Sequence, residues 1–221
     1  MTPRALQALA GLAFGVPSVC DVLCSEMSAA AVCSDPSRVD RVVLGCDPGT
    51  QTGWTLVVRY DGVITPLVAW VIGQRAVSGT RAVAMQPARA PGFRDHLALV
   101  QAVGNFCDEE MPAPVVVCED WFAGPNGSTV RDTAKQFYFV EAAAQSEGFV
   151  FRPVMHSTWK KTYIGRGNMK SEDALVAYAG RSYNDHPHVK RWAGKVASQL
   201  TRSDDSAALG LATHWLSTEA T

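Results

Sequence analysis

Short apolar runs separated by turn sequences predict the strands of a sheet in the middle of this chain. Residues 41–46 form an almost continuous apolar run, which is typical of a strand buried on both faces. Residues 54–60 and 63–72 predict two further strands, joined by an Asp-Gly hairpin turn. Apolar runs over residues 114–119 and 149–155 predict a fourth and a fifth strand.

Helical periodicity follows the first three strands. Apolar residues recur at helical spacing over residues 93–110, and further helices are predicted over residues 129–147, from Ser171 onward, and from Asp204 to about Leu216. Residues 73–92 are rich in Gly, Ala, Arg and Pro and predict a loop. Three antiparallel strands followed by alternating helices and strands indicate an α/β fold, with a mixed five-stranded sheet and helices on both faces.

The first 40 residues differ from the rest of the chain. They are rich in Ala and Ser, carry few charges, and begin with one basic residue followed by a short apolar stretch. We interpret residues 1–40 as an N-terminal appendage, either disordered or a leader, on a domain spanning residues 41–221. A later start at Met27 is the alternative.

Composition is typical of a globular protein and excludes few functions. Hydrophobic residues make up 47% and charged residues 19% of the 221 residues, and the formal net charge is −1. A surface that binds nucleic acid must therefore be local. No apolar run approaches the ~20 residues that span a bilayer, so no membrane partner is expected. The six cysteines form no C-x-x-C pair, which favours free thiols and a cytoplasmic location, with an organelle as the alternative.

Carboxylates stand where the predicted elements begin or end. Asp47 follows the first strand, Glu119 ends the fourth, and Asp204 and Asp205 open the last helix. The ends of central strands in an α/β sheet form the usual ligand crevice. Each acid alone has an ordinary explanation as a turn residue, a solvated strand end or a helix N-cap. Their combination predicts convergence in one site.

Converging carboxylates need a counter-charge, because like charges in one place cannot all stay ionised. Mg²⁺ or Mn²⁺ prefers carboxylate and water ligands and would supply that charge. Two such ions would serve the hydrolysis of a phosphodiester. The sequence therefore predicts a metal-dependent nuclease whose catalytic and metal-binding residues are Asp47, Glu119, Asp204 and Asp205.

Four motifs follow one another along the chain, over residues 43–54, 117–122, 159–170 and 203–212. In this order they resemble the RuvC family of Holliday-junction resolvases. The resemblance implies an RNase H-like fold, a homodimer, two metal ions per site, and paired symmetric nicks across a four-way DNA junction.

The last motif departs from the family pattern, which has two acids three residues apart. If Asp204 is the first acid, the second position falls on Ala207; if Asp205 is the first, it falls on Ala208. We prefer Asp204, because it keeps residues 208–210 in phase with the small, apolar packing face of the family's helix.

The third motif predicts phosphate contacts. Its cations surround two glycines in a predicted loop, and the candidates for DNA binding are Lys160, Lys161, Arg166 and Lys170. Trp159 is expected to pack beneath this loop. In the second motif, Phe122 precedes a flexible turn and is either a wedge between DNA bases or part of the core.

Three other functions stay open. An actin-like ATPase or sugar kinase shares the opening Asp-x-Gly-Thr turn, but the chain is short for two duplicated domains and shows no second phosphate loop. An RNA-processing nuclease of the YqgF type shares the opening motif but lacks the Glu-x-x-Phe strand. A non-catalytic junction-binding protein would be compatible with the missing second acid of the last helix.

Overall fold

The structure is a computed structural model. It describes residues 9, 11–12, 18–22, 31–73, 89–107, 111–120, 127–167 and 203–219. The side chains of residues 18–22, 127–129 and 203–205 lie outside this description. The helix predicted from Ser171 and most of the loop predicted over residues 73–92 also lie outside it.

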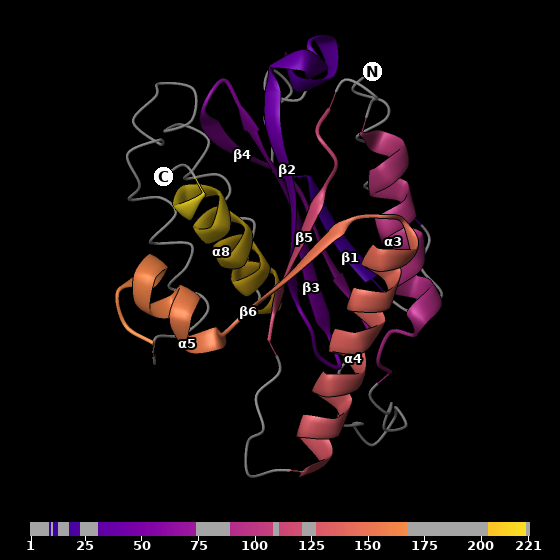
Figure 1. Cartoon of the computed structure of the whole chain (residues 1–221). Coiled ribbons are helices and arrows are strands. Elements are labelled where there is room, and N and C mark those ends of the chain that lie inside the picture. Colours follow the sequence, from indigo (N-terminus) through magenta and orange to yellow (C-terminus); the bar gives the residue numbers. More distant parts are fainter. Residues whose placement is uncertain are drawn as a thin grey trace, which may run out of the picture.

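A six-stranded sheet forms the centre of the molecule, in the order β1-β4-β3-β2-β5-β6 (Figure 1). The strands β2, β3 and β4 are antiparallel, whereas β5 and β6 run parallel to β2. The bounds are β1 Ser18–Val22, β2 Val39–Asp47, β3 Thr52–Tyr60, β4 Val63–Ile72, β5 Val115–Glu119 and β6 Val150–Val154. All five predicted strands are confirmed, and their apolar side chains make most of the buried core.

The extra strand comes from the segment interpreted as an appendage. β1 pairs with β4 from Ser18 opposite Ile72 to Val22 opposite Val68. Val32 and Cys33 are buried in the same core as the sheet. The domain boundary at residue 41 stays a prediction, but these parts of residues 1–40 belong to the packed body.

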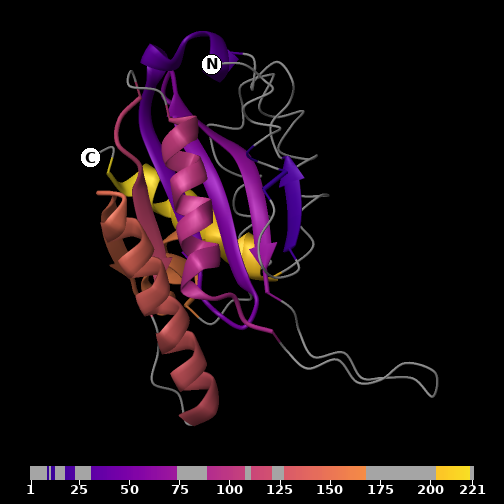
Figure 2. The ribbon, with the colours of Figure 1, turned by 90° about the vertical axis from the view of Figure 1, so that its right-hand side faces the viewer.

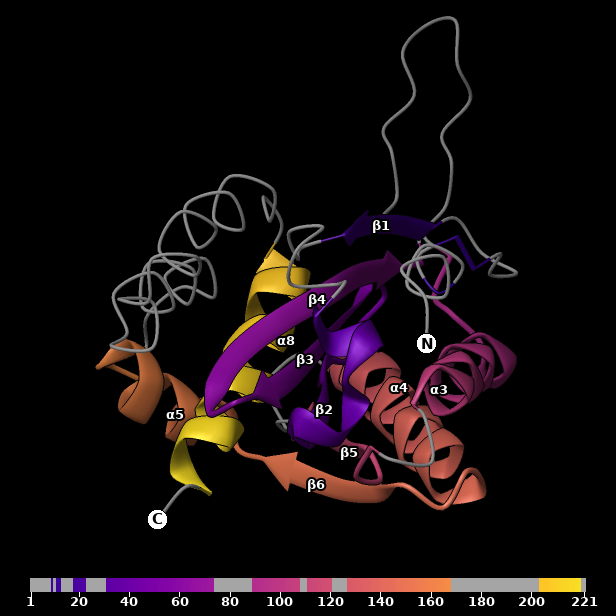
Figure 3. The ribbon, with the colours of Figure 1, turned by 90° about the horizontal axis from the view of Figure 1, so that it is seen from above.

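Helices cover both faces of the sheet, which confirms the predicted fold class. α3 (Phe93–Phe106) and α4 (Gly127–Ser146) lie on one face, and α8 (Ser203–Thr218) lies on the other (Figures 1 and 3). Figure 2 shows α3 in front of the sheet and α8 behind it. A short 3₁₀ helix, η1 (Pro36–Arg38), precedes β2. Among the described residues, no helix has both the length and the apolar character that crossing a membrane would need.

α8 lies directly on β2 at a glycine. A β-carbon built on Gly45 would lie 2.0 Å from the carbonyl oxygen of Ala208 and 3.0 Å from the β-carbon of Ala212. Only glycine on the strand, facing small residues on the helix, permits so close an approach.

Contacts at the far end of α8 give its direction. Arg41, near the start of β2, pairs with Glu219 at 3.7 Å, just beyond the last turn of α8. Arg59 donates to the carbonyl of Leu216 at 3.5 Å. α8 therefore runs antiparallel to β2, and its first turn lies at the end of the sheet where β2 ends.

A side chain at position 45 should displace α8. We expect Gly45→Ala to lower the free energy of unfolding by at least about 3 kcal/mol, because backbone atoms must move to relieve the overlap. Chemical denaturation would measure this loss. The matched control is Gly104→Ala on α3, where the nearest atom would be the end of the Phe149 ring at 3.3 Å. Equal stability of the two variants would contradict the close contact.

A buried histidine joins α3, α4 and β3 on the opposite face. His96 is completely buried, and its Nε2 lies 2.8 Å from Oε1 of Gln136 on α4. Because the amide oxygen only accepts, Nε2 carries a proton. The ring also lies 5.9 Å from that of Trp54. Burial lowers the pKa of His96 from 6.5 to about 4.

This pKa predicts a loss of stability in acid. Above pH 6.5 the histidine is neutral in both the folded and the unfolded chain. Between pH 6.5 and 4 only the unfolded chain takes up the proton, so the free energy of unfolding should fall by up to about 3 kcal/mol. Denaturation curves at stepped pH should show a shallower fall over this range for His96→Gln than for the unmodified chain. Identical pH profiles would contradict the assignment.

Candidate active site

Two acidic side chains end neighbouring parallel strands. Cys46 of β2 is paired with Cys118 of β5, so Asp47 and Glu119 follow in register on strands about 4.8 Å apart. Paired positions of parallel strands point to the same face, and Asp47 shares the face of Gly45 because it is two residues further on. Both carboxylates therefore lie on the side of the sheet that carries α8.

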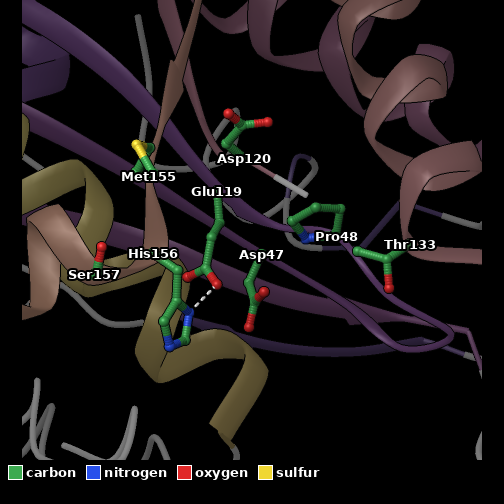
Figure 4. A pocket seen from close by; sticks show the side chains of 8 residues that line it. All are labelled: Asp47, Pro48, Glu119, Asp120, Thr133, Met155, His156 and Ser157. Carbon is green, nitrogen blue, oxygen red and sulfur yellow. Dashed lines mark hydrogen bonds and ion pairs between the residues drawn. The ribbon is translucent and has the colours of Figure 1, made fainter. Parts of the chain in front are cut away.

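Both residues line one open cleft of about 530 Å³ at the end of the sheet. Figure 4 shows their carboxylates facing the same space, whereas Asp120 points away from them. The rest of the cleft wall comes from the β2 turn, the end of β5, α4 and the residues after β6, and consists of Pro48, Asp120, Thr133, Met155, His156 and Ser157. In the described lining there is no Lys or Arg, so the cleft has acidic character.

Glu119 is held at both carboxylate oxygens. Nδ1 of His156 is hydrogen-bonded to Oε1, and Nε1 of Trp159 donates to Oε2 at 2.9 Å (Figure 4 shows the His156 contact). The side chain of Glu119 is 14% exposed and that of His156 is 45% exposed, whereas Trp159 is completely buried. Glu119 thus projects from the protein interior toward the cleft with a fixed orientation.

The two residues that precede the acids are uncharged and point to the opposite face of the sheet. Cys46 and Cys118 are completely buried, and burial, with a smaller contribution from their mutual hydrogen bond, raises the pKa of the Cys46 thiol well above its ordinary value. Burial also raises the pKa of Cys118. Both residues stay neutral thiols, and the four cysteines with described side chains are all free, as predicted.

The first turn of α8 reaches the same end of the sheet. Ala208 lies over Gly45, and Asp204 is four helical residues before Ala208, while Asp47 is two strand residues after Gly45. Each of these stretches spans about 6 to 7 Å, so the backbone of Asp204 and Asp205 lies near the level of Asp47. The side chains of Asp204 and Asp205 lie outside the description. Among the described side chains alone, no three His, Cys, Asp or Glu residues form a metal-binding group.

The alanine that stands where the family has its second helix acid belongs to the core. Ala207 and Ala208 are both completely buried. Ala208 makes the close contact with Gly45, which agrees with the small packing face used to choose the register. The assignment of Asp204 over Asp205 stays a prediction.

Structures of resolvases are among those similar to this chain. A structure of T. thermophilus RuvC in complex with a Holliday junction substrate has a TM-score of 0.46 and 16% identity, over 79% of this chain and 92% of that one. Another Thermus thermophilus RuvC structure has a TM-score of 0.46 and 18% identity, over 81% and 96%. The yeast mitochondrial Holliday junction resolvase Ydc2 has a TM-score of 0.47 and 12% identity, over 99% and 94%.

In structure, this chain is similar to RuvC-type resolvases. The sheet has the RNase H-like arrangement that the motifs imply, with three antiparallel strands followed by two parallel ones. No protein-family model and no curated protein matches the sequence. Because the identities and TM-scores are low, we take the function from the chain's own residues.

The basic segment is a helix where a loop was predicted. α5 (His156–Trp159) continues directly into a π-helical turn, η2 (Lys160–Ile164), which ends at Gly165 with φ +108°. Trp159 and Tyr163 are both buried and stand four residues apart, so they bury one face of a helix. The two glycines had suggested a loop, but the burial of Trp159 and Tyr163 stabilises a helix here.

Two of the four predicted DNA-binding cations are exposed. Lys161 and Arg166 lie at the surface. Lys160 is only 4% exposed, and its Nζ lies 5.4 Å from the centre of the Trp159 ring. Its predicted place in a loop is thus wrong, because it lies in η2 and packs beside the buried indole; its role in DNA binding stays a prediction. Lys170 and Phe122 lie outside the described residues.

His156 is the site residue that the sequence analysis missed. It follows β6, the strand next to β5, and the end of such a strand reaches the same edge of the sheet as Glu119. This position just after a predicted strand was the sequence signal that could have identified His156 as a site residue. His214, on α8, lies 3.1 Å from the Thr162 hydroxyl through its Nδ1 and so joins α8 to η2.

Proposed function

We propose that this protein is a metal-dependent, structure-selective endonuclease that resolves four-way DNA junctions by paired nicks. One observation carries the hydrolytic part: Asp47 and Glu119, from neighbouring strand ends, line one open cleft at the end of the sheet that the first turn of α8 also reaches. The choice of a four-way junction rests on the motif resemblance.

The donor set of the cleft suits a divalent cation with a preference for oxygen. Asp47 and Glu119 would hold it, and Asp204 or Asp205 would complete the ligands from α8. Two adjacent carboxylates repel one another, and the described cleft lining offers no Lys or Arg to balance them. Bound Mg²⁺ or Mn²⁺ would supply an activated water and neutralise charge at the leaving oxygen.

The chain itself would position the nucleic acid around this cleft. The cleft is open, so a phosphodiester backbone can enter it. Lys161 and Arg166 are exposed on the segment that follows the His156 turn, where they would neutralise phosphates. Paired nicks in opposing strands need two sites, and we therefore propose a homodimer that presents two clefts to one junction.

A non-catalytic junction-binding protein is the second candidate. It is favoured by Ala207, which occupies the family's second acidic position on the last helix and is completely buried. That position therefore adds no carboxylate to the cleft. If Asp204 and Asp205 do not replace it, the site would bind DNA without cutting it.

Neutralising either strand-end carboxylate should stop cleavage. We expect Asp47→Asn and Glu119→Gln to lower the rate of nicking of a synthetic four-way junction by at least about 100-fold, while binding to the junction stays within a few-fold. Gel assays with Mg²⁺, with Mn²⁺ and with EDTA would measure cleavage, and mobility shifts would measure binding. Asp120→Asn is the matched control, because this carboxylate points away from the other two.

Three results would decide between the candidates. Nicks in opposing strands that need the metal support the proposed nuclease. Binding by the unmodified chain without cleavage in either metal indicates the junction-binding protein. Cleavage by Asp47→Asn or Glu119→Gln at the unmodified rate would contradict the metal site.

The exposed cations should contribute to DNA binding through charge alone. We expect Lys161→Gln and Arg166→Gln each to weaken junction binding and to reduce the dependence of log K on log salt by about 1, because each removes one phosphate contact. Titrations at several salt concentrations would measure this slope. Arg41→Gln is the control, since Arg41 is exposed at the opposite end of β2. An unchanged slope for both variants would place the DNA elsewhere.

A further inference from the structure

A single helical turn holds the side chain of Glu119 by two hydrogen bonds. His156 and Trp159, at the two ends of α5, each hydrogen-bond a different oxygen of the Glu119 carboxylate. Residues three apart on a helix lie on the same side of it, so one turn can present both donors to one carboxylate.

The sheet brings this turn to Glu119. Glu119 is the partner of Val154 in the parallel pairing of β5 with β6, and the N–H of Asp120 donates to the carbonyl of Val154 at 2.9 Å. The chain therefore leaves β6 beside Glu119, and α5 begins two residues later. No long connection is needed to place the two donors.

The turn is anchored on its far side. Trp159 is completely buried, and Tyr163, one turn further on, is 3% exposed. The contact between Thr162 and His214 fastens the following π-helical turn to α8. The donors to Glu119 thus have a fixed position relative to both the sheet and the helix that carries Asp204 and Asp205.

We propose that His156 and Trp159 are positioning residues that orient Glu119 for binding a divalent cation. An ionised carboxylate offers about four lone-pair sites, and the two donors occupy two of them. One site on each oxygen is left for the cation, on the side of the cleft that Asp47 also faces (Figure 4). Carboxylate ligands of metals are themselves commonly held by hydrogen bonds of this kind. This inference rests on the proposed metal-dependent function.

Removing either donor should weaken metal binding without removing a ligand. Loss of a partner that orients a metal ligand typically costs about 10- to 100-fold in affinity. We therefore expect His156→Ala and Trp159→Phe each to raise the dissociation constant for Mn²⁺ by about 10-fold or more. The Mn²⁺ concentration for half-maximal cleavage should rise in parallel, whereas the cleavage rate at saturating Mn²⁺ should change less.

A conservative variant separates orientation from a general structural effect. The side-chain amide of Asn can place its N–H near the position of His Nδ1, so His156→Asn should restore Mn²⁺ affinity to within a few-fold of the unmodified chain. Gln places its amide farther out, so His156→Gln should resemble His156→Ala. His156 is 45% exposed, so these variants should unfold at the same denaturant concentration as the unmodified chain.

The experiment is a calorimetric titration of the full chain and its variants with Mn²⁺ alone, followed by junction cleavage at graded Mn²⁺. Unchanged Mn²⁺ affinity in both His156→Ala and Trp159→Phe would overturn the positioning role. Tighter binding by His156→Ala would also overturn it, because His156 would then compete with the cation. A failure of the unmodified chain to bind Mn²⁺ would instead count against the proposed function itself.

Discussion

The contact between the backbone of Gly45 and α8 is the constraint on which the site depends. A helix can lie this close to a strand only where the strand has no side chain and the helix offers alanines. The contact fixes how far α8 is advanced along β2, and the position of Glu219 beside Arg41 shows that α8 runs antiparallel to β2. The contact therefore sets which residues of α8 stand at the end of the sheet, so the packing of a hydrophobic core determines the position of charged residues.

The cleft is built from elements that are held in different ways. Asp47 and Glu119 are placed by the backbone pairing of β2 with β5, two neighbouring strands inside the sheet. The turn that holds Glu119 is placed by the pairing of β5 with β6 and by burial of Trp159. The thiols of Cys46 and Cys118, on the opposite face of the sheet, stay uncharged. The acidic character of the cleft therefore comes from the carboxylates that line it.

Strong local patterns made part of this structure predictable. The uninterrupted apolar runs identified the five strands, and Asp47 and Glu119 were found because each stands at the end of one. Register and burial depend on tertiary contacts that no local pattern records. Lys160 was therefore placed in a loop although it lies in a helical turn and packs against Trp159, and His156 was overlooked although it follows a predicted strand. β1 is only five residues long and is formed by pairing with β4, so its own sequence gave little sign of it.

β1 covers the backbone edge of the strand β4. β4 is ten residues long, and nine of them are buried, including Trp70. Without β1, the backbone N–H and C=O groups of residues 68–72 would form an open edge on an apolar strand, which is the kind of surface that pairs with other chains and aggregates. A chain that starts at Met27 would lack this cover. β1 thus closes an apolar sheet edge that could otherwise pair with another chain.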